Sequence, residues 1–220
     1  LKIERKSWPR KSSPLPTTVL TSGTQVLSRF QVTANPAYDI AMKKLTFAIA
    51  TSSVSQMRTV LPAFRLFNIT DARFMNNATG SAVSYFDNKK NYDSNKRLIV
   101  RTYADSSEYL GEVTISAGRS EVFELRGMVA DDATVGGSVV TTLLGDFNAP
   151  AIGMVDYWKM NAYQASNLIW SDYSGDFVGT HGSASYDWMN GYRVPGLPTT
   201  GLNPSVLTSG TTVYSPTVNI

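Results

Sequence analysis

The single histidine of the chain is the first place to look for catalytic chemistry. His181 stands in a Gly-Thr-His-Gly-Ser stretch, with Ser183, Ser185 and Asp187 close behind it in sequence. Nucleophilic catalysis uses these residue types, but a triad is assembled in space, and neighbours in sequence seldom form one. The chain also has no Gly-x-Ser-x-Gly turn to present a nucleophile. We therefore expect no catalytic residue and no enzyme activity.

Residues that ligate metals are scarce. The chain has no cysteine and one histidine, too few soft or borderline ligands for a zinc or other transition-metal site. Calcium accepts carboxylate and carbonyl oxygens, and the candidate loops are 87–95, 131–132 and 172–176. None has the spacing of an EF-hand, and each reads more simply as a polar turn. We predict no cofactor and no metal site, with calcium the one ion left open.

Aromatic residues are concentrated between positions 170 and 192. Rings beside Ser, Gly and Asp are typical of sugar-binding faces, where they serve as flat apolar platforms. The alternative is that the tryptophans are buried anchors that pin a long loop to the sheet, and this packing role is favoured. The candidate glycan platform consists of Trp170, Tyr173, Trp188 and Tyr192.

Ten residues near the start of the chain return near its end. Val19–Ser28 and Val206–Ser215 are identical at eight of ten positions. The second copy can be a strand donated to another subunit, a strand that completes its own domain, or the start of a further repeat in a tandem array. We expect 205–220 to be ordered as a strand against a sheet. Its candidate assembly residues are Val206, Leu207, Val213, Tyr214, Val218 and Ile220.

Charge and composition divide the chain unevenly. Residues 1–13 carry five basic residues against Glu4, a net of +4, whereas the whole 220-residue chain carries +3, so the remainder has −1. Residues 1–18 end in Ser-Ser-Pro-Leu-Pro and read as an extended basic arm or linker. The whole chain is 42% hydrophobic, which is enough for a substantial core, and no stretch is long and apolar enough to span a membrane.

Short segments with alternating or β-branched residues, punctuated by glycine, follow the arm. They predict an all-β fold, an antiparallel β-sandwich of Ig-like or jelly-roll type, over residues 19–204, with long loops in 146–204. Lys43 and Lys44 break the apolar period, as a bulge would. The expected strands are 26–32, 40–49, 64–69, 82–86, 98–103, 109–115, 121–129, 138–144, 154–163, 167–170 and 192–194.

Several motifs in order resemble exported β-sandwich domains of candidate-phyla, Patescibacteria-type bacteria, which occur in large surface proteins. The resemblance covers about residues 19–200, and its most specific part is the pair Trp-Ser-Asp and Asp-Trp-x-Asn-Gly-Tyr. It implies an extracellular structural or adhesive role and supplies no catalytic residues. The motifs are Thr21–Ala34, Lys43–Phe47, Phe123–Gly127, Ile169–Asp172, Asp187–Tyr192 and Gly196–Pro198.

Three functions compete. The leading hypothesis is a secreted structural subunit that self-assembles into a filament, tube or surface layer by terminal strand addition, with copies of itself as partners. The second is an adhesin module that binds cell-wall or host glycans. The third is a jelly-roll viral coat protein, ranked last because an arm of +4 is small for packaging nucleic acid, which makes a nucleic-acid partner unlikely.

Overall fold

The computed structural model describes ten stretches of the chain, and every regular element within them is a β-strand. The expectation of an all-β chain is therefore confirmed for this part of the molecule. The predicted strand 154–163 and the polar loop 87–95 lie outside it. The described residues are 1–5, 23–52, 64–74, 84–86, 96–101, 113–129, 137–148, 166–172, 188–202 and 204–208.

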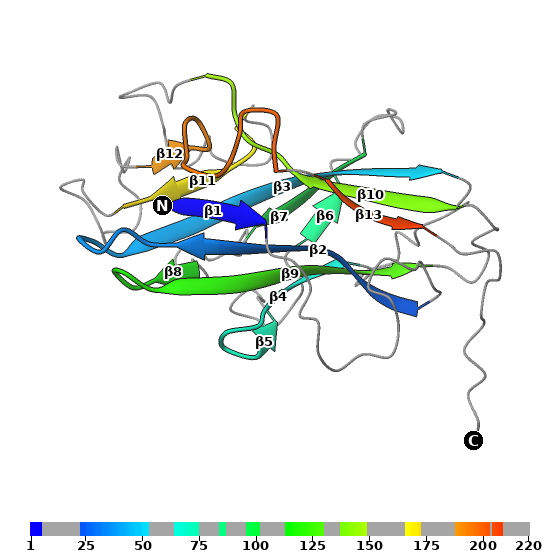
Figure 1. Ribbon diagram of the computed structural model, residues 1–220, viewed down its shortest axis with the longest axis horizontal. Helices are drawn as coiled ribbons and strands as arrows, with labels where there is room; N and C mark the ends of the chain where they lie inside the picture. The colour runs from blue at the N-terminus through cyan, green and yellow to red at the C-terminus, as the bar shows by residue number, and fades with distance from the viewer. Residues whose placement is uncertain are drawn as a thin grey trace.

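The strands form two antiparallel sheets (Figure 1). The first sheet has the order β1 (Lys2–Arg5), β2 (Gly23–Thr33), β9 (Ser120–Val129), β4 (Phe64–Asn68) and β5 (Arg73–Phe74).

The second sheet is built around the longest strand, β3 (Ile40–Ser52). Along one path its order is β12 (Trp188–Asn190), β11 (Ile169–Ser171), β3, β10 (Ser138–Leu143) and β13 (Ser205–Thr208). Strands β7 (Lys96–Arg101) and β8 (Val113–Ile115) also pair with β3, and β6 (Ser84–Phe86) pairs with β7.

A shared apolar core joins the two sheets. Phe30 of β2 and Phe47 of β3 are fully buried, and their ring centroids lie 6.0 Å apart across the sheets. Phe123 of β9 stacks on Phe30 with centroids 5.6 Å apart. Alternate residues of the strands supply this core, as the alternation in β4 and β10 illustrates.

The expected bulge in β3 is confirmed. On the ladder to β11, Lys44 pairs with Ile169 and Met42 pairs with Trp170, so Lys43 has no opposite residue. Because of the extra residue, the alternation of buried and exposed side chains is out of step on the two sides of the bulge. Both Met42 before it and Leu45 after it are therefore buried, although they are an odd number of positions apart. The apolar pattern of β3 therefore predicted the irregularity correctly.

The first five residues belong to the sheet and not to an extended arm. Strand β1 pairs with β2 from Lys2↔Thr33 to Arg5↔Phe30, and the side chain of Ile3 is completely buried. The arm expected over 1–18 is thus wrong for residues 1–5, because Ile3 supplies apolar contact between the charged residues. Residues 6–18 lie outside the described part.

One further expectation differs from the structure. The strand predicted at 192–194 is absent there, because 192–193 forms a turn in which Arg193 has a positive φ of 52°, and the strand lies earlier, at β12. The expectation that 205–220 is ordered as a strand against a sheet is confirmed for Ser205–Thr208, where β13 pairs with β10 of the same chain, and residues 209–220 lie outside the described part.

Candidate functional site

Strand β13, the described part of the candidate assembly segment, lies at the edge of its sheet. Val206 pairs with Val140 and Leu207 with Val139 of β10, and no strand of the described residues pairs with the other edge of β13. Leu207 is buried in the core, whereas Val206 is 44% exposed. The remaining candidates, Val213, Tyr214, Val218 and Ile220, lie outside the described residues.

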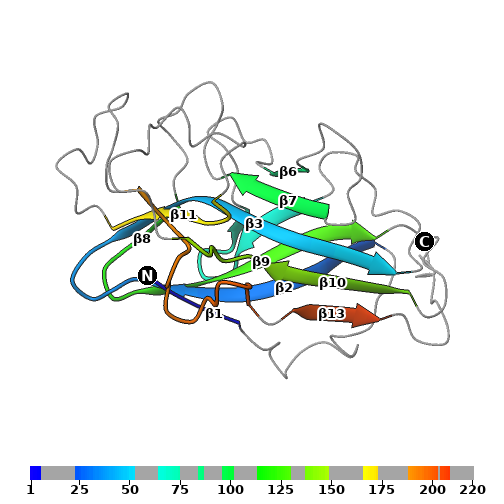
Figure 2. The same ribbon diagram turned by 90° about the horizontal axis from the view of Figure 1, so that it is seen from above.

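The first copy of the repeated sequence also reaches a sheet edge. Strand β1 ends opposite Phe30, so Gly23–Ser28 of β2 is paired with β9 on one side and with no described strand on the other. β13 packs close to β2, and Figure 2 shows β1 and β13 along the same side of the molecule. We call Gly23–Ser28 together with Ser205–Thr208 the uncharged edge, since neither segment contains a charged residue.

The neighbouring edge at β1 is protected, in contrast to the uncharged edge. Three of the four β1 residues are charged, and Lys2 Nζ lies 2.6 Å from Glu4 Oε1. The amide of Ile3 donates to the carbonyl of Pro195 over 2.9 Å, so the turn at 194–197 covers that strand. Charge and a covering loop are two common ways in which a sheet edge is kept from pairing with other chains.

Asp146 braces the loops that follow β10. Its side chain is buried, and its carboxylate accepts the amides of Asn167 at 2.7 Å, Leu168 at 3.1 Å and Gly191 at 2.8 Å. One buried charge therefore ties three separated segments together, with its oxygens satisfied by main-chain donors. Asp146 was not among the functional residues predicted from the sequence.

A second anchor in the same region is the buried Lys44 of β3. Its Nζ donates to the carbonyl of Ser166 at 2.6 Å, which fixes the chain entering β11. Burial of a lysine requires such partners, because an unpaired ammonium in the interior is costly.

The four residues of the candidate glycan platform are only partly brought together. Trp170 is half-buried against the core, and its indole Nε1 donates to the carbonyl of Asn190 at 3.0 Å. The main chain of Trp188 lies on the neighbouring strand, in register with Ser171. Trp170 therefore links β11 to β12 through its side chain as well as through the strand pairing. Tyr173 and the side chain of Trp188 lie outside the described residues.

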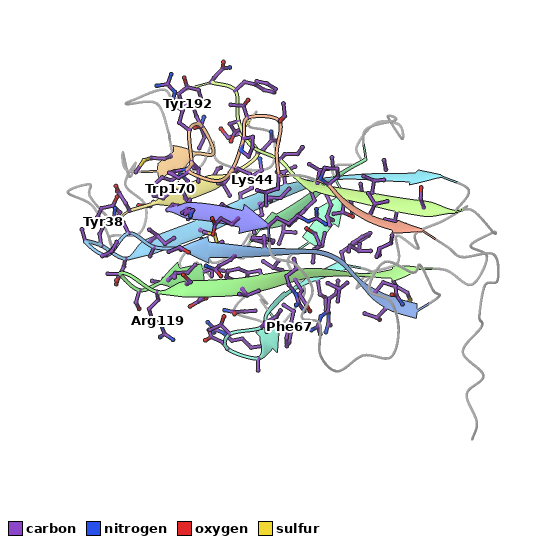
Figure 3. All side chains as sticks on the ribbon, in the orientation of Figure 1. Tyr38, Lys44, Phe67, Arg119, Trp170 and Tyr192 are labelled. Atoms are coloured by element: carbon purple, nitrogen blue, oxygen red, sulfur yellow. The ribbon has the colours of Figure 1, made fainter. Side chains whose placement is uncertain are left out.

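Tyr192 lies at the same end of the molecule as Trp170 (Figure 3). The guanidinium of Arg193 lies 5.1 Å from the ring centroid of Tyr192, and the main-chain amide of Tyr192 donates to Asn190 Oδ1 at 3.0 Å. Among the aromatic side chains that the structure describes, Phe147 is the most exposed, at 70%, and it directly follows the buried Asp146.

On the outer face of the first sheet, the carboxylate of Glu124 accepts hydrogen bonds from two arginines. Arg29 donates to Oε1, with Nε at 3.0 Å and Nη2 closer, and Arg126 donates to Oε2 from Nε at 2.9 Å and Nη2 at 2.7 Å. Arg126 also lies over the ring of Phe67, 3.8 Å from its centroid. These forked contacts cover Glu124 almost completely and fix β2, β9 and β4 side by side.

Glu121 occupies a less favourable position at the start of β9. Burial raises the pKa of Glu121, and the nearby carboxylate of Asp71 acts in the same direction, while the hydrogen bond from Asn68 Nδ2 to Oε2, at 2.7 Å, opposes the rise. The same amide donates to Asp71 Oδ2 at 3.2 Å and so lies between the two acids.

The described residues contain no group of three or more His, Cys, Asp or Glu side chains placed to hold a metal ion. The calcium candidates at 87–95 and 131–132, and most of 172–176, lie outside them, as does His181. The described part also contains no helix that is long and apolar enough to cross a membrane.

No protein-family model, no curated protein and no solved structure matches this chain. The resemblance to exported bacterial sandwich domains therefore stays a prediction.

Proposed function

We propose that this chain is an extracellular structural subunit, folded as an Ig-like β-sandwich, that assembles with copies of itself through strand addition at its C-terminal segment. Extracellular placement rests on the resemblance given above. The observation that carries the assembly is the position of β13 at an uncharged sheet edge, from which the chain runs directly into the rest of the repeated sequence.

The order of the strands supports the Ig-like form of the sandwich. With β1, β2, β3, β4, β9, β10 and β13 taken in chain order as strands A to G, the first sheet has the order A-B-E-D and the second C-F-G. This is the arrangement of a constant-type immunoglobulin domain. Strands β5 to β8 then belong to an enlarged D–E connection, and β11 and β12 to an enlarged F–G connection.

The repeated sequence supports assembly through added strands. In the first copy, Gly23–Ser28 forms part of β2, antiparallel to β9. Gly210–Ser215 has nearly the same residues, so it has the same capacity to pair with a sheet edge. A terminal segment that pairs with a neighbour's sheet gains main-chain hydrogen bonds, and head-to-tail addition of this kind produces open polymers unless the rotation closes a ring.

Electron microscopy of purified protein tests the proposal. The chain 1–220 is compared with a chain ending at Thr208, which retains β13 and therefore its own second sheet. We expect ordered polymers or layers from the longer chain and dispersed particles from the shorter one. Identical polymers from both would refute donation by the C-terminal segment, and dispersed particles from both would refute assembly.

A further inference from the structure

Among the described residues, the uncharged edge has neither the charges nor the covering turn that protect β1, which lies further along the same side of β2. Strand β13 reads Ser-Val-Leu-Thr, with no charged residue, no proline within it and no bulge on its ladder to β10. Its single proline neighbour, Pro204, precedes the strand. Regular, uncharged edges of this kind are templates for further strand pairing.

We infer that the occupant of this edge is β13 of a second copy, paired antiparallel about a two-fold axis so that the second sheet continues from one subunit into the next. This inference rests on the proposed function, because it specifies where two subunits first meet. It differs from the C-terminal donation in using residues that already belong to the folded body.

The absence of charge allows a second copy to be the partner at this edge. Two like edges that carry charges repel when apposed, whereas Ser205–Thr208 and the adjacent Gly23–Ser28 carry none, so self-apposition has no electrostatic cost. A two-fold interface is also self-complementary, since the same donors and acceptors of one edge face those of the other.

The geometry of a sheet restricts the register. A two-fold axis perpendicular to the sheet leaves each side chain on its own face, and directly opposite residues share a face. A residue of one copy therefore lies opposite either the same residue of the second copy or a residue an even number of positions away from it. Placing Val206 opposite Val206 brings together the two exposed apolar side chains, whereas Leu207 is already buried within its own subunit.

The cysteine-free sequence allows a direct test by disulfide formation. In Val206→Cys, the two thiols face each other across neighbouring strands, at the separation that a disulfide spans. Phe147→Cys is the matched control, because Phe147 is more exposed, 70% against 44%, and collides at least as readily by chance.

We expect Val206→Cys to form a disulfide-linked dimer about tenfold faster than Phe147→Cys under the same oxidant, since pairing raises the effective concentration of the thiols. Val206→Lys should reduce the dimer fraction in solution. Equal rates for the two cysteine variants would overturn the inference.

The same preparations, viewed by electron microscopy, separate this inference from the proposed function. Polymers without selective crosslinking at position 206 would overturn the β13 pairing and leave assembly standing. Selective crosslinking without polymers would support the pairing and refute the larger assembly.

Discussion

The main-chain amide of Ile3 donates to the carbonyl oxygen of Pro195 over 2.9 Å, which joins the first strand to a turn almost 200 residues later. The next residue, Gly196, has a φ of 81°, and a Cβ at this position would lie 2.1 Å from the carbonyl oxygen of Ile3. The turn therefore packs directly on β1 and closes the edge of the first sheet at that strand. Further along the same side, the uncharged edge has no such cover among the described residues.

Gly196→Ala should destabilise the protein strongly, because it combines a positive φ with a main-chain clash. Gly23→Ala is the control, since Gly23 has a φ of 93° with no atom within 4 Å of the added Cβ. We expect a loss of about 1 kcal/mol in the free energy of unfolding for the control and about 3 kcal/mol or more for Gly196→Ala. Chemical denaturation measures both, and equal losses would show that the turn does not press on β1.

Asp146→Ala should loosen the loops between β10 and β13. The substitution leaves three main-chain amides without their acceptor in a buried place, and we expect a loss of about 3 kcal/mol. Asp39→Ala is the control, because exposed Asp39 accepts one amide, that of Ala117, at 2.7 Å, and should cost about 1 kcal/mol or less. Hydrogen exchange at Asn167, Leu168 and Gly191 should rise only in Asp146→Ala, and unchanged protection there would contradict this role.

Glu124→Gln should destabilise the first sheet, because it leaves Arg29 and Arg126 adjacent without their shared carboxylate. Buried ion pairs cost several kcal/mol to break, and since both guanidiniums reach solvent we expect about 2 kcal/mol. Glu4→Gln removes the exposed pair with Lys2 and should change stability by less than about 0.5 kcal/mol. Thermal unfolding of the two variants measures the difference, and similar losses would remove Glu124 as a structural centre.

Glu121→Gln should alter the pH dependence of stability. Because burial raises the pKa of Glu121, the folded state holds this proton more tightly than the unfolded chain does. Stability therefore falls as pH rises from the ordinary glutamate value of about 4.3 through the raised folded value. Glutamine lacks this proton, so the melting temperature of the variant relative to the natural chain should increase between about pH 4 and pH 7. A constant difference across that interval would contradict the assigned cause.

Sequence patterns predicted a structural feature correctly where that feature depends on neighbouring residues. The break in the apolar period at Lys43 and Lys44 predicted the bulge in β3, since strand alternation is a property of neighbouring residues. The same reasoning misassigned Lys2–Arg5, because three charged residues masked Ile3, whose burial depends on Pro195 at the far end of the chain. Long-range partners of that kind cannot be derived from alternation.

The bracing of the loops depends on distant residues as well. Asp146 stands beside Gly145, and Asn190 stands beside Gly191. An Asp or Asn next to a glycine is typical of a turn held by a side-chain hydrogen bond, and this was the signal in the sequence that could have indicated the two residues. The amides that donate hydrogen bonds to Asp146 could not be predicted, because they lie 21 to 45 residues further along the chain. The exposure of Val206 likewise follows from the position of β13 at the sheet edge.

The molar mass of the chain in solution tests self-association most directly. Light scattering over a concentration series should give a mass that rises well above the 24.0 kDa of one chain, and Val206→Lys should lower it at each concentration. A mass of one chain at every concentration, for the natural sequence as for the variant, would contradict the central claim that this protein assembles with itself.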